Sequence, residues 1–338
     1  MKIIVDNKIP FIEGKLEPFG EVVYLPSDKI DSKTVEDADV LVIRTRTKCD
    51  KKLFENSKVK LIVTATIGTD HIDLPWCEGK GIEVRNAPGC NAPAVAQYVW
   101  ASLLHNGFKP EGSVIGVVGY GHIGQIVARW GKEMGCKVMI CDPPRYKSGF
   151  RDVEYKALDD LLTEADVITV HTPLSFTGDD ATFGMIGERE LDKMKPGAWI
   201  INAARGGIVV EKELLEVMKR KDLKSVTDCW ENEPDINLKL LEKAVVATPH
   251  IAGYSLEGKK RATEMAVETV KKWVANKNGK EARATDCETV DMKCSVSPHK
   301  IKESYNPSRD TENLRLNPKN FEKLRETYNY RHEVLCDI

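Results

Sequence analysis

A run of spaced glycines in the middle of the chain constrains the fold more than any other feature. The apolar segment Val114–Val118 has the composition of a buried parallel strand and leads directly into Gly119-Tyr120-Gly121-His122-Ile123-Gly124. A segment with apolar residues at helical spacing follows, from Ile123 to Met134. A strand, a G-x-G-x-x-G turn and a helix in this order are typical of a dinucleotide-binding unit.

Each glycine of this turn has a separate physical role. Gly119 allows the tight turn, Gly121 lets the backbone approach a pyrophosphate, and Gly124 permits close packing of the helix on the strand. The N-terminus of the helix adds unpaired N–H groups and a partial positive charge. We therefore expect the turn, including His122 and Ile123, to hold the phosphates of a dinucleotide. The alternative is a glycine turn in an unrelated α/β protein.

An acidic residue after the next strand indicates which dinucleotide is bound. Asp142 follows Gly124 by 18 residues, at the end of the apolar segment Lys137–Cys141. A carboxylate there accepts hydrogen bonds from the ribose hydroxyls and repels a 2′-phosphate, so NAD is favoured over NADP. Arg145 lies nearby and weakens that preference slightly.

Short apolar runs alternate with amphipathic or turn-rich segments along most of the chain. Strands are predicted at 3–5, 22–24, 40–43, 61–63, 82–84, 114–118, 137–141, 166–170, 198–202, 224–227 and 245–247. Helices are predicted at about 92–105, after the glycine turn, and at about 256–275. This alternation predicts an α/β protein with two parallel-sheet units in tandem. Residues 281–319 are polar and predicted to be irregular, and a short helical pattern starts at Asn320.

Composition and charge exclude several classes of protein. The chain has 338 residues, of which 41% are apolar, and a formal net charge of -2, which gives nucleic acid no electrostatic footing as the main partner. We find no run of about 18 apolar residues and no signal-peptide pattern, so we expect no membrane association. The nine cysteines include no C-x-x-C pair, which favours reduced cytoplasmic thiols and no metal site.

Three later segments are predicted to leave the carboxyl ends of strands, where ligands bind in such sheets. They span residues 201–207, 228–234 and 248–254. Together they supply one guanidinium, one carboxylate and one imidazole, from Arg205, Glu233 and His250.

These three groups match the needs of alcohol oxidation. His250 can take the hydroxyl proton, because the ordinary pKa of imidazole lies near physiological pH. Glu233 can hydrogen-bond the other ring nitrogen and stabilise the imidazolium, and Arg205 can hold a carboxylate through its planar fork. The alternative for each residue alone is a structural or solvated role.

Three sequence patterns place the chain close to a known family. They are Asn202-x-x-Arg205-Gly206, Asp228-x-x-x-x-Glu233-Pro234 and Pro249-His250-x-x-Gly253. Together they resemble the signatures of the D-2-hydroxyacid dehydrogenases, a resemblance that implies Arg205, Glu233 and His250 as the catalytic residues. It implies further cofactor contacts from Thr172, Ala203, Ala204, Arg205, Asp228 and Gly253.

The resemblance also implies a domain arrangement. A flavodoxin-like substrate domain would comprise residues 1–93 plus 255–280. A Rossmann-like NAD-binding domain, made of residues 94–254, would be inserted into it. Residues 281–338 would be a C-terminal extension, either a flexible tail or an arm that packs on the partner subunit of a homodimer.

Narrower patterns resemble members of the family that act on a phosphorylated 2-hydroxy acid. These patterns lie at residues 3–10, 64–71, 87–91, 141–145 and 250–258. Carried over by position, Thr45, Thr66 and Tyr254 would contact the substrate. Arg44, with Arg46, could balance a phosphate charge, the alternative being that both are solvated surface cations.

The extent of this resemblance leaves two other functions open. It covers roughly residues 1–275, with a fainter match at Phe321–Arg325 and a poor match in the rest of the tail. One alternative is another 2-hydroxyacid dehydrogenase, of the phosphoglycerate or hydroxypyruvate type. The other is an NAD-sensing binding protein, similar to transcriptional corepressors built on the same scaffold.

Overall fold

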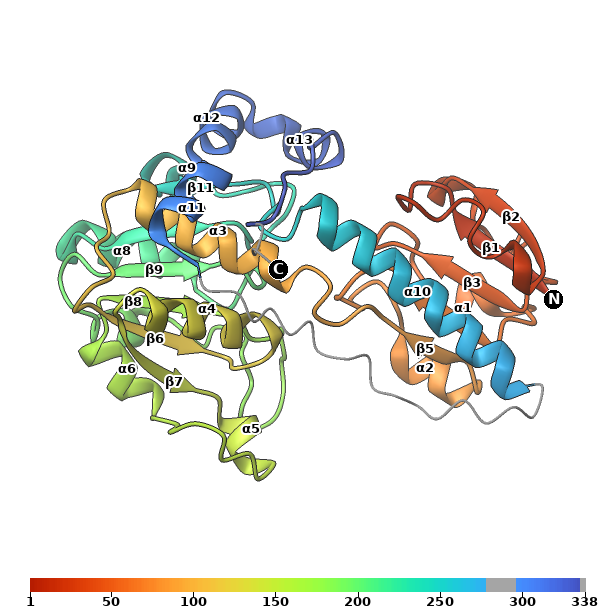
Figure 1. Cartoon of the computed structure of the whole chain (residues 1–338), viewed down its shortest axis with the longest axis horizontal. Coiled ribbons are helices and arrows are strands. Elements are labelled where there is room, and N and C mark those ends of the chain that lie inside the picture. The colour runs from red at the N-terminus through yellow and green to blue at the C-terminus, as the bar shows by residue number, and fades with distance from the viewer. Residues whose placement is uncertain (278–295, 335–338) are drawn as a thin grey trace. The chain divides into compact units, whose positions relative to one another are not determined.

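The chain forms two compact units, each with its own parallel sheet. The structure is a computed structural model that describes residues 1–277 and 296–334 (Figure 1). The first unit contains residues 1–91 and the helix that runs from residue 257, and the second contains residues 92–256 and 296–334. Among the described residues, no helix is both long and apolar enough to cross a bilayer.

The first unit is built on a sheet of order β2-β1-β3-β4-β5, in which every pair of neighbours is parallel. Its strands are β1 (Lys2–Asp6), β2 (Glu21–Leu25), β3 (Val40–Ile43), β4 (Leu61–Thr64) and β5 (Glu83–Arg85). Its helical segments are η1 (Glu17–Phe19), η2 (Ser27–Lys29), α1 (Lys51–Phe54), α2 (Leu74–Gly79) and α10 (Leu256–Lys277). The strand order is that of flavodoxin-like folds, as expected. Helix α10 covers one face of this sheet through Ala266 and Val270.

The second unit carries a parallel sheet of order β11-β10-β9-β8-β6-β7. Its strands are β6 (Val114–Val118), β7 (Lys137–Cys141), β8 (Val167–Val170), β9 (Trp199–Asn202), β10 (Lys224–Thr227) and β11 (Val246–Ala247). The chain moves outward from β6 to β7 and then returns to the other side of β6 with β8. The carboxyl ends of β6 and β8 therefore form a topological switch point, where such sheets bind ligands.

Both faces of this second sheet are buried under helices (Figure 1). The helices are α3 (Ala92–His105), α4 (His122–Glu133), α6 (Leu158–Glu164), α7 (Glu188–Leu191), α8 (Glu211–Lys221) and α9 (Leu238–Lys243), whereas α5 (Pro143–Lys147) buries no residue. Trp100 and Trp130, from α3 and α4, are fully buried on one face, and Leu161 and Leu214, from α6 and α8, on the other. Double-sided burial explains why β6 is a continuous apolar run and why β7 and β9 are mostly apolar.

The α/β architecture and the strands predicted from the sequence are confirmed, but the prediction for residues 281–319 was wrong. These residues were expected to be irregular, whereas the described part contains α11 (Pro298–Ser304), α12 (Ser308–Leu316) and η3 (Pro318–Asn320). The short helical pattern predicted from Asn320 is confirmed by α13 (Phe321–Glu326). Residues 278–295 and 335–338 of the predicted extension lie outside the described residues. Helices α11 and α12 were not predicted because each buries only one or two side chains, such as Ile301 in α11 and Leu314 in α12.

The tail wraps around the β11 edge of the second sheet. Ile301 and Tyr305 pack with the cluster on one face of the sheet, whereas Leu314 and Phe321 pack with the cluster on the other. The Thr311 hydroxyl accepts a hydrogen bond from the backbone N–H of Ala247 in β11, at 3.1 Å. The described tail residues thus cover an edge strand of their own chain, which protects backbone groups that would otherwise be open to pairing.

Candidate active site

The glycine turn lies at the switch point of the second sheet and has the space that a dinucleotide needs. Gly119 has a φ of +91°, and a Cβ there would lie 2.8 Å from the carbonyl of His171, in the loop that follows β8. A Cβ on Gly124 would lie 2.0 Å from the Gly119 oxygen. A Cβ on Gly121 would meet no protein atom within 4 Å. Gly119 and Gly124 are therefore required by the protein itself, while Gly121 borders open space at the N-terminus of α4.

Asp142 closes this turn from the end of β7. Its carboxylate accepts hydrogen bonds from the backbone N–H groups of Tyr120, at 2.7 Å, and Arg145, at 3.0 Å. The guanidinium of Arg145 forms an ion pair with Asp152 at 3.0 Å and stacks on Phe150. Protein groups thus hold one end of the Arg145 guanidinium, while its Nε atom is buried without a hydrogen-bond partner among the described residues.

Two polar groups in the loop after β8 are also available to hydrogen-bond a cofactor. The Thr172 hydroxyl and the Nδ1 atom of His171 are buried and have no hydrogen-bond partner among the described residues. Nε2 of His171 contacts the Thr169 hydroxyl at 2.9 Å, and burial lowers the pKa of His171 to about 3, so the ring is neutral. Unpartnered polar atoms beside a glycine cradle are what a site lined for a dinucleotide presents before the ligand is added.

His250 and Glu233 form a hydrogen-bonded pair in the same unit. Nδ1 of His250 lies 2.8 Å from Oε2 and 3.1 Å from Oε1 of Glu233. Burial raises the pKa of Glu233, but the hydrogen bond and charge of His250 outweigh burial, with smaller help from the charge of Arg325, and the net shift is downward. The carboxylate therefore stays ionised, and the other nitrogen of His250, Nε2, is left for exchange of a proton with a ligand.

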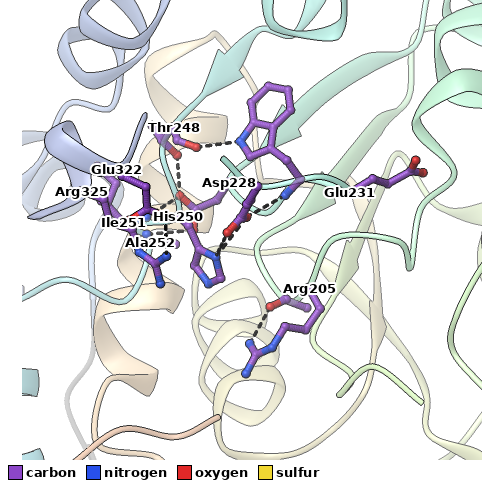
Figure 2. A network of polar contacts seen from close by, with 12 residues as sticks. Arg205, Asp228, Glu231, Thr248, His250, Ile251, Ala252, Glu322 and Arg325 are labelled. Atoms are coloured by element: carbon purple, nitrogen blue, oxygen red, sulfur yellow. Dashed lines mark hydrogen bonds and ion pairs between the residues drawn. The ribbon is translucent and has the colours of Figure 1, made fainter. Parts of the chain in front are cut away.

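The loop that carries His250 is held by Asp228. His250 has a φ of +55°, in the left-handed region that non-glycine residues rarely adopt. The Asp228 carboxylate accepts the backbone N–H groups of Ile251, at 2.8 Å, and Ala252, at 2.9 Å, together with the Thr248 hydroxyl at 2.6 Å. Asp228, expected at the nicotinamide end of the cofactor, is therefore buried beneath the His250 loop (Figure 2).

Arg205 lies on the loop that follows β9. The Asn202 side chain braces this loop by donating to the Arg205 carbonyl at 2.9 Å and accepting from the Ala204 N–H at 3.2 Å. A Cβ on the next residue, Gly206, would lie 1.8 Å from the Trp230 oxygen, so glycine is needed where the two loops meet. Close contact with the loop of residues 228–234 brings Arg205 to the same corner as His250 (Figure 2), the hydrogen-bond partner of Glu233.

Sequence reasoning missed two groups at this corner, Cys229 and Arg325. Ligand atoms of Cys229, Glu233 and His250 lie within 4.8 Å of one another, although the hydrogen bond between His250 and Glu233 accounts for that pair without a metal. Burial raises the pKa of Cys229 well above its ordinary value, and the charges of Arg205 and Arg325 oppose the shift. Both guanidinium groups therefore act on one buried thiol. The faint resemblance at Phe321–Arg325 assigned no role to residue 325.

The remaining expected substrate residues are divided between the two units. Arg44, Thr45 and Thr66 lie in the first unit, near the carboxyl ends of β3 and β4. The guanidinium of Arg44 pairs with the fully buried carboxylate of Asp6, with Nε 2.9 Å from Oδ2, so its charge is already balanced. The hydroxyl of Thr66 contacts that of Thr64 at 2.6 Å, and Thr45 is exposed.

The last expected substrate residue, Tyr254, lies in the second unit, four residues after His250. Its hydroxyl accepts a hydrogen bond from Nε of Arg325 at 3.1 Å. The second unit therefore combines a proton acceptor with its carboxylate partner, two cations and a glycine cradle. This combination suits oxidation of an anionic alcohol by a dinucleotide.

Comparison with known proteins gives consistent results. A family model described as the D-isomer-specific 2-hydroxyacid dehydrogenase, NAD-binding domain, matches residues 84–252. The erythronate-4-phosphate dehydrogenase of Bacteroides fragilis is 40% identical over 341 residues, which cover 98% of this chain and 97% of that protein. The enzyme of the same name from Pseudomonas fluorescens is 44% identical over 268 residues, covering 78% of this chain and 70% of that protein. The match with the Bacteroides protein includes the tail, whereas the match with the Pseudomonas protein covers a share of the chain close to that of the expected residues 1–275.

Solved structures show the same architecture. The NAD-bound 3-phosphoglycerate dehydrogenase of Entamoeba histolytica has a TM-score of 0.69 and 27% identity, covering 82% of this chain and 96% of that one. The D-lactate dehydrogenase of Aquifex aeolicus, complexed with NAD and lactic acid, has a TM-score of 0.67 and 27% identity, covering 83% of this chain and 97% of that one.

Proposed function

The chain belongs to the D-isomer-specific 2-hydroxyacid dehydrogenases and is an NAD-dependent oxidoreductase, and from that premise we propose that it oxidises 4-phospho-D-erythronate. The product is 2-oxo-3-hydroxy-4-phosphobutanoate, formed with NADH, as a step toward pyridoxal 5′-phosphate. The substrate named for the Bacteroides fragilis relative supports this proposal, because that protein matches this chain along nearly the whole of both chains.

The site residues take separate roles in this reaction. Nε2 of His250 accepts the proton of the C2 hydroxyl, and Glu233 holds the ring by Nδ1 and stabilises the imidazolium that forms. Arg205 binds the substrate carboxylate and polarises the oxygen on C2. NAD, when bound, accepts the hydride that leaves C2. The 2.8 Å contact between His250 and Glu233, in the unit with the glycine cradle, is the observation that carries this proposal.

The cofactor and substrate contacts follow from the same family membership. The cofactor contacts are Gly119, Gly121, His122, Ile123, Gly124, Asp142, Thr172, Ala203, Ala204, Arg205, Asp228 and Gly253. Thr45, Thr66, Tyr254 and Arg44 are the substrate contacts, and the unit that holds the first sheet serves as the substrate domain. A homodimer in the cytoplasm stays a prediction. Six free cysteines, buried among the described residues, are consistent with a reducing compartment.

The test is an NADH-production assay with purified protein. We expect a higher kcat/KM with 4-phospho-D-erythronate than with 3-phosphoglycerate or hydroxypyruvate-type substrates such as D-glycerate. His250→Ala should lower kcat by about 10²–10⁴-fold, because the general base is lost, while the affinity for NAD stays within about two-fold. A clear preference for 3-phosphoglycerate would overturn the proposed substrate, and a fully active His250→Ala would overturn the mechanism.

A further inference from the structure

Helix α13 places a largely buried cation at the catalytic corner, although it lies far from the family motifs in sequence. The side chain of Arg325 is 17% exposed. Its nearest carboxylate contact, between Nη1 and Oε1 of Glu322, is long at 3.8 Å, and Glu322 is half-buried at the surface. Nε donates to the Tyr254 hydroxyl at 3.1 Å. A buried guanidinium without a close carboxylate needs another anionic partner to offset its lost hydration.

The tail holds Arg325 in position by forming hydrogen bonds with the loop that carries His250. Arg331, which is 9% exposed, donates to the carbonyls of Ile251, at 3.0 Å, and Tyr254, at 3.1 Å, and also bonds the carbonyl of Ala252. The Ser255 hydroxyl donates to Glu333 at 2.6 Å. The position of α13 relative to His250 is therefore set by hydrogen bonds on the catalytic loop itself.

Arg325 also lies within electrostatic range of the reacting groups. Its charge acts on the Glu233 carboxylate and on the Cys229 thiol, and the charge of Arg205 acts on the same thiol. Figure 2 draws Arg325, His250 and Arg205 in the same part of the second unit. The charges of two guanidinium groups thus reach the Cys229 thiol, which lies within 4.8 Å of the His250 ring nitrogen, while the proposed chemistry needs only one of them for a carboxylate.

We propose that Arg325 is a specificity-determining residue that binds the phosphate of the substrate. The inference rests on the proposed function, because 4-phospho-D-erythronate carries anionic groups at both ends, with the reacting C2 next to the carboxylate. Arg205 takes the carboxylate, and Arg325 takes the phosphate with the Tyr254 hydroxyl beside it. A planar guanidinium is suited to two parallel hydrogen bonds with phosphate oxygens. Of Arg44 and Arg46, the cations that were predicted for this role, Arg44 is already paired with Asp6.

The experiment compares a phosphorylated substrate with its unphosphorylated counterpart. In Arg325→Met, kcat/KM for 4-phospho-D-erythronate should fall about 100-fold, mainly through KM, while kcat/KM for D-erythronate changes less than about three-fold. Arg325→Lys, which keeps the charge but loses the fork, should fall between wild type and Arg325→Met. Inorganic phosphate should inhibit the wild type competitively and inhibit Arg325→Met at least ten-fold less strongly.

A matched control separates recognition from stability. Arg315, in the neighbouring helix α12, donates to the carbonyls of Leu241 and Ala244 and has no contact with the catalytic loop. Arg315→Met should lower the unfolding temperature and leave the ratio of the two kcat/KM values unchanged. Equal losses with both substrates in Arg325→Met would assign Arg325 to holding Tyr254 alone and overturn the inference, as would unchanged kinetics.

Failure of the proposed function gives a different result. If the wild type turns over no 4-phospho-D-erythronate, that function is wrong, and phosphate inhibition of whichever 2-hydroxy acid is oxidised still tests Arg325. If phosphate then inhibits wild type and Arg325→Met equally, Arg325 does not bind phosphate.

Discussion

The dinucleotide turn and the catalytic corner lie in the same unit but are built in opposite ways. The turn uses six consecutive residues, 119–124, and much of its support is internal, since Gly124 packs on the oxygen of Gly119. The catalytic corner, made of Arg205, Glu233 and His250, is supported by side chains that are distant in sequence, from Asp228 to Arg331. The turn needs glycines that leave space for a ligand, while the corner needs hydrogen bonds from Asp228 and Arg331 that hold the His250 loop.

This difference shows what each region can tolerate. In the turn, a single added methyl group is enough to block a ligand or a backbone contact. In the corner, the left-handed conformation of His250 persists because Asp228 holds the N–H groups of the following residues and Arg331 holds their carbonyls. Damage to the corner can therefore arise from residues that touch neither substrate nor cofactor.

The largest expected effect tests the dependence of the turn on space. Gly121→Ala should raise the Kd for NAD about 100-fold and leave thermal unfolding unchanged, because the new Cβ meets no protein atom within 4 Å but borders the phosphate cradle. Gly124→Ala should also lose NAD affinity and, in addition, lower the free energy of unfolding by about 1–3 kcal/mol, since its Cβ would lie 2.0 Å from a backbone oxygen. Calorimetric titration with NAD and thermal melts separate the two. If Gly121→Ala bound NAD normally, the space beside residue 121 would not be the phosphate site.

The same contrast explains what the sequence could and could not predict. The strands were predictable because many parallel strands buried on both faces, such as Val114–Val118, are apolar runs. The glycine turn and the loops that carry Arg205, Glu233 and His250 were predictable because each is a contiguous pattern. The hydrogen bonds from Asp228 to the His250 loop were not predicted, because they depend on backbone contacts that no spacing encodes, and its predicted contact with the cofactor stays a prediction.

The tail was the least predictable part. Helix α12 buries Thr311 and Leu314 and is otherwise polar, so it shows almost no periodic signal. Arg325 and Arg331 resemble the other tail cations in sequence, and only contacts with Tyr254 and Ile251, more than 70 residues away, distinguish them. The roles of Arg325 and Arg331 therefore depend on tertiary contacts, which no local sequence pattern predicts.

An intermediate effect tests the hydrogen bonds that hold the His250 loop at the corner. Arg331→Met should lower kcat about 10–100-fold, since the His250 loop loses the donors to three of its carbonyls and the imidazole shifts from its productive position. The Kd for NAD should rise by a smaller factor than kcat falls, because the glycine turn makes no use of Arg331 and only Asp228 and Gly253 of the proposed cofactor contacts adjoin the His250 loop. Steady-state kinetics beside NAD titration give both numbers, and Arg315→Met is the control for general damage to the tail. Equal weakening of NAD binding and turnover would mean that the turn and the corner are not independently supported.

The smallest expected effect concerns Glu211, a buried carboxyl group that hydrogen-bonds the loop of residues 228–234. Glu211, at the start of α8, accepts the N–H of Glu231 at 2.8 Å, and Glu231 accepts the N–H of Glu211 at the same distance. Burial raises the pKa of Glu211 from 4.5 to about 7, and the nearby charge of Glu231 acts in the same direction. Because the folded state holds this proton more tightly than the unfolded chain, its contribution to stability is complete below pH 4.5 and is lost as the pH rises through about 7.

Glu211→Gln should therefore remove this pH dependence while keeping an oxygen for the N–H of Glu231. We expect the variant to match the wild type near pH 4.5 and to exceed it above pH 7 by about 1–3 kcal/mol in unfolding free energy, with kcat unchanged. Urea unfolding at a series of pH values measures the difference. Glu216→Gln, on the exposed face of the same helix, should keep the wild-type slope between pH 5 and 7. A loss of kcat in Glu211→Gln would make the charge of this carboxyl group, and not only its hydrogen bonds, part of what holds the corner.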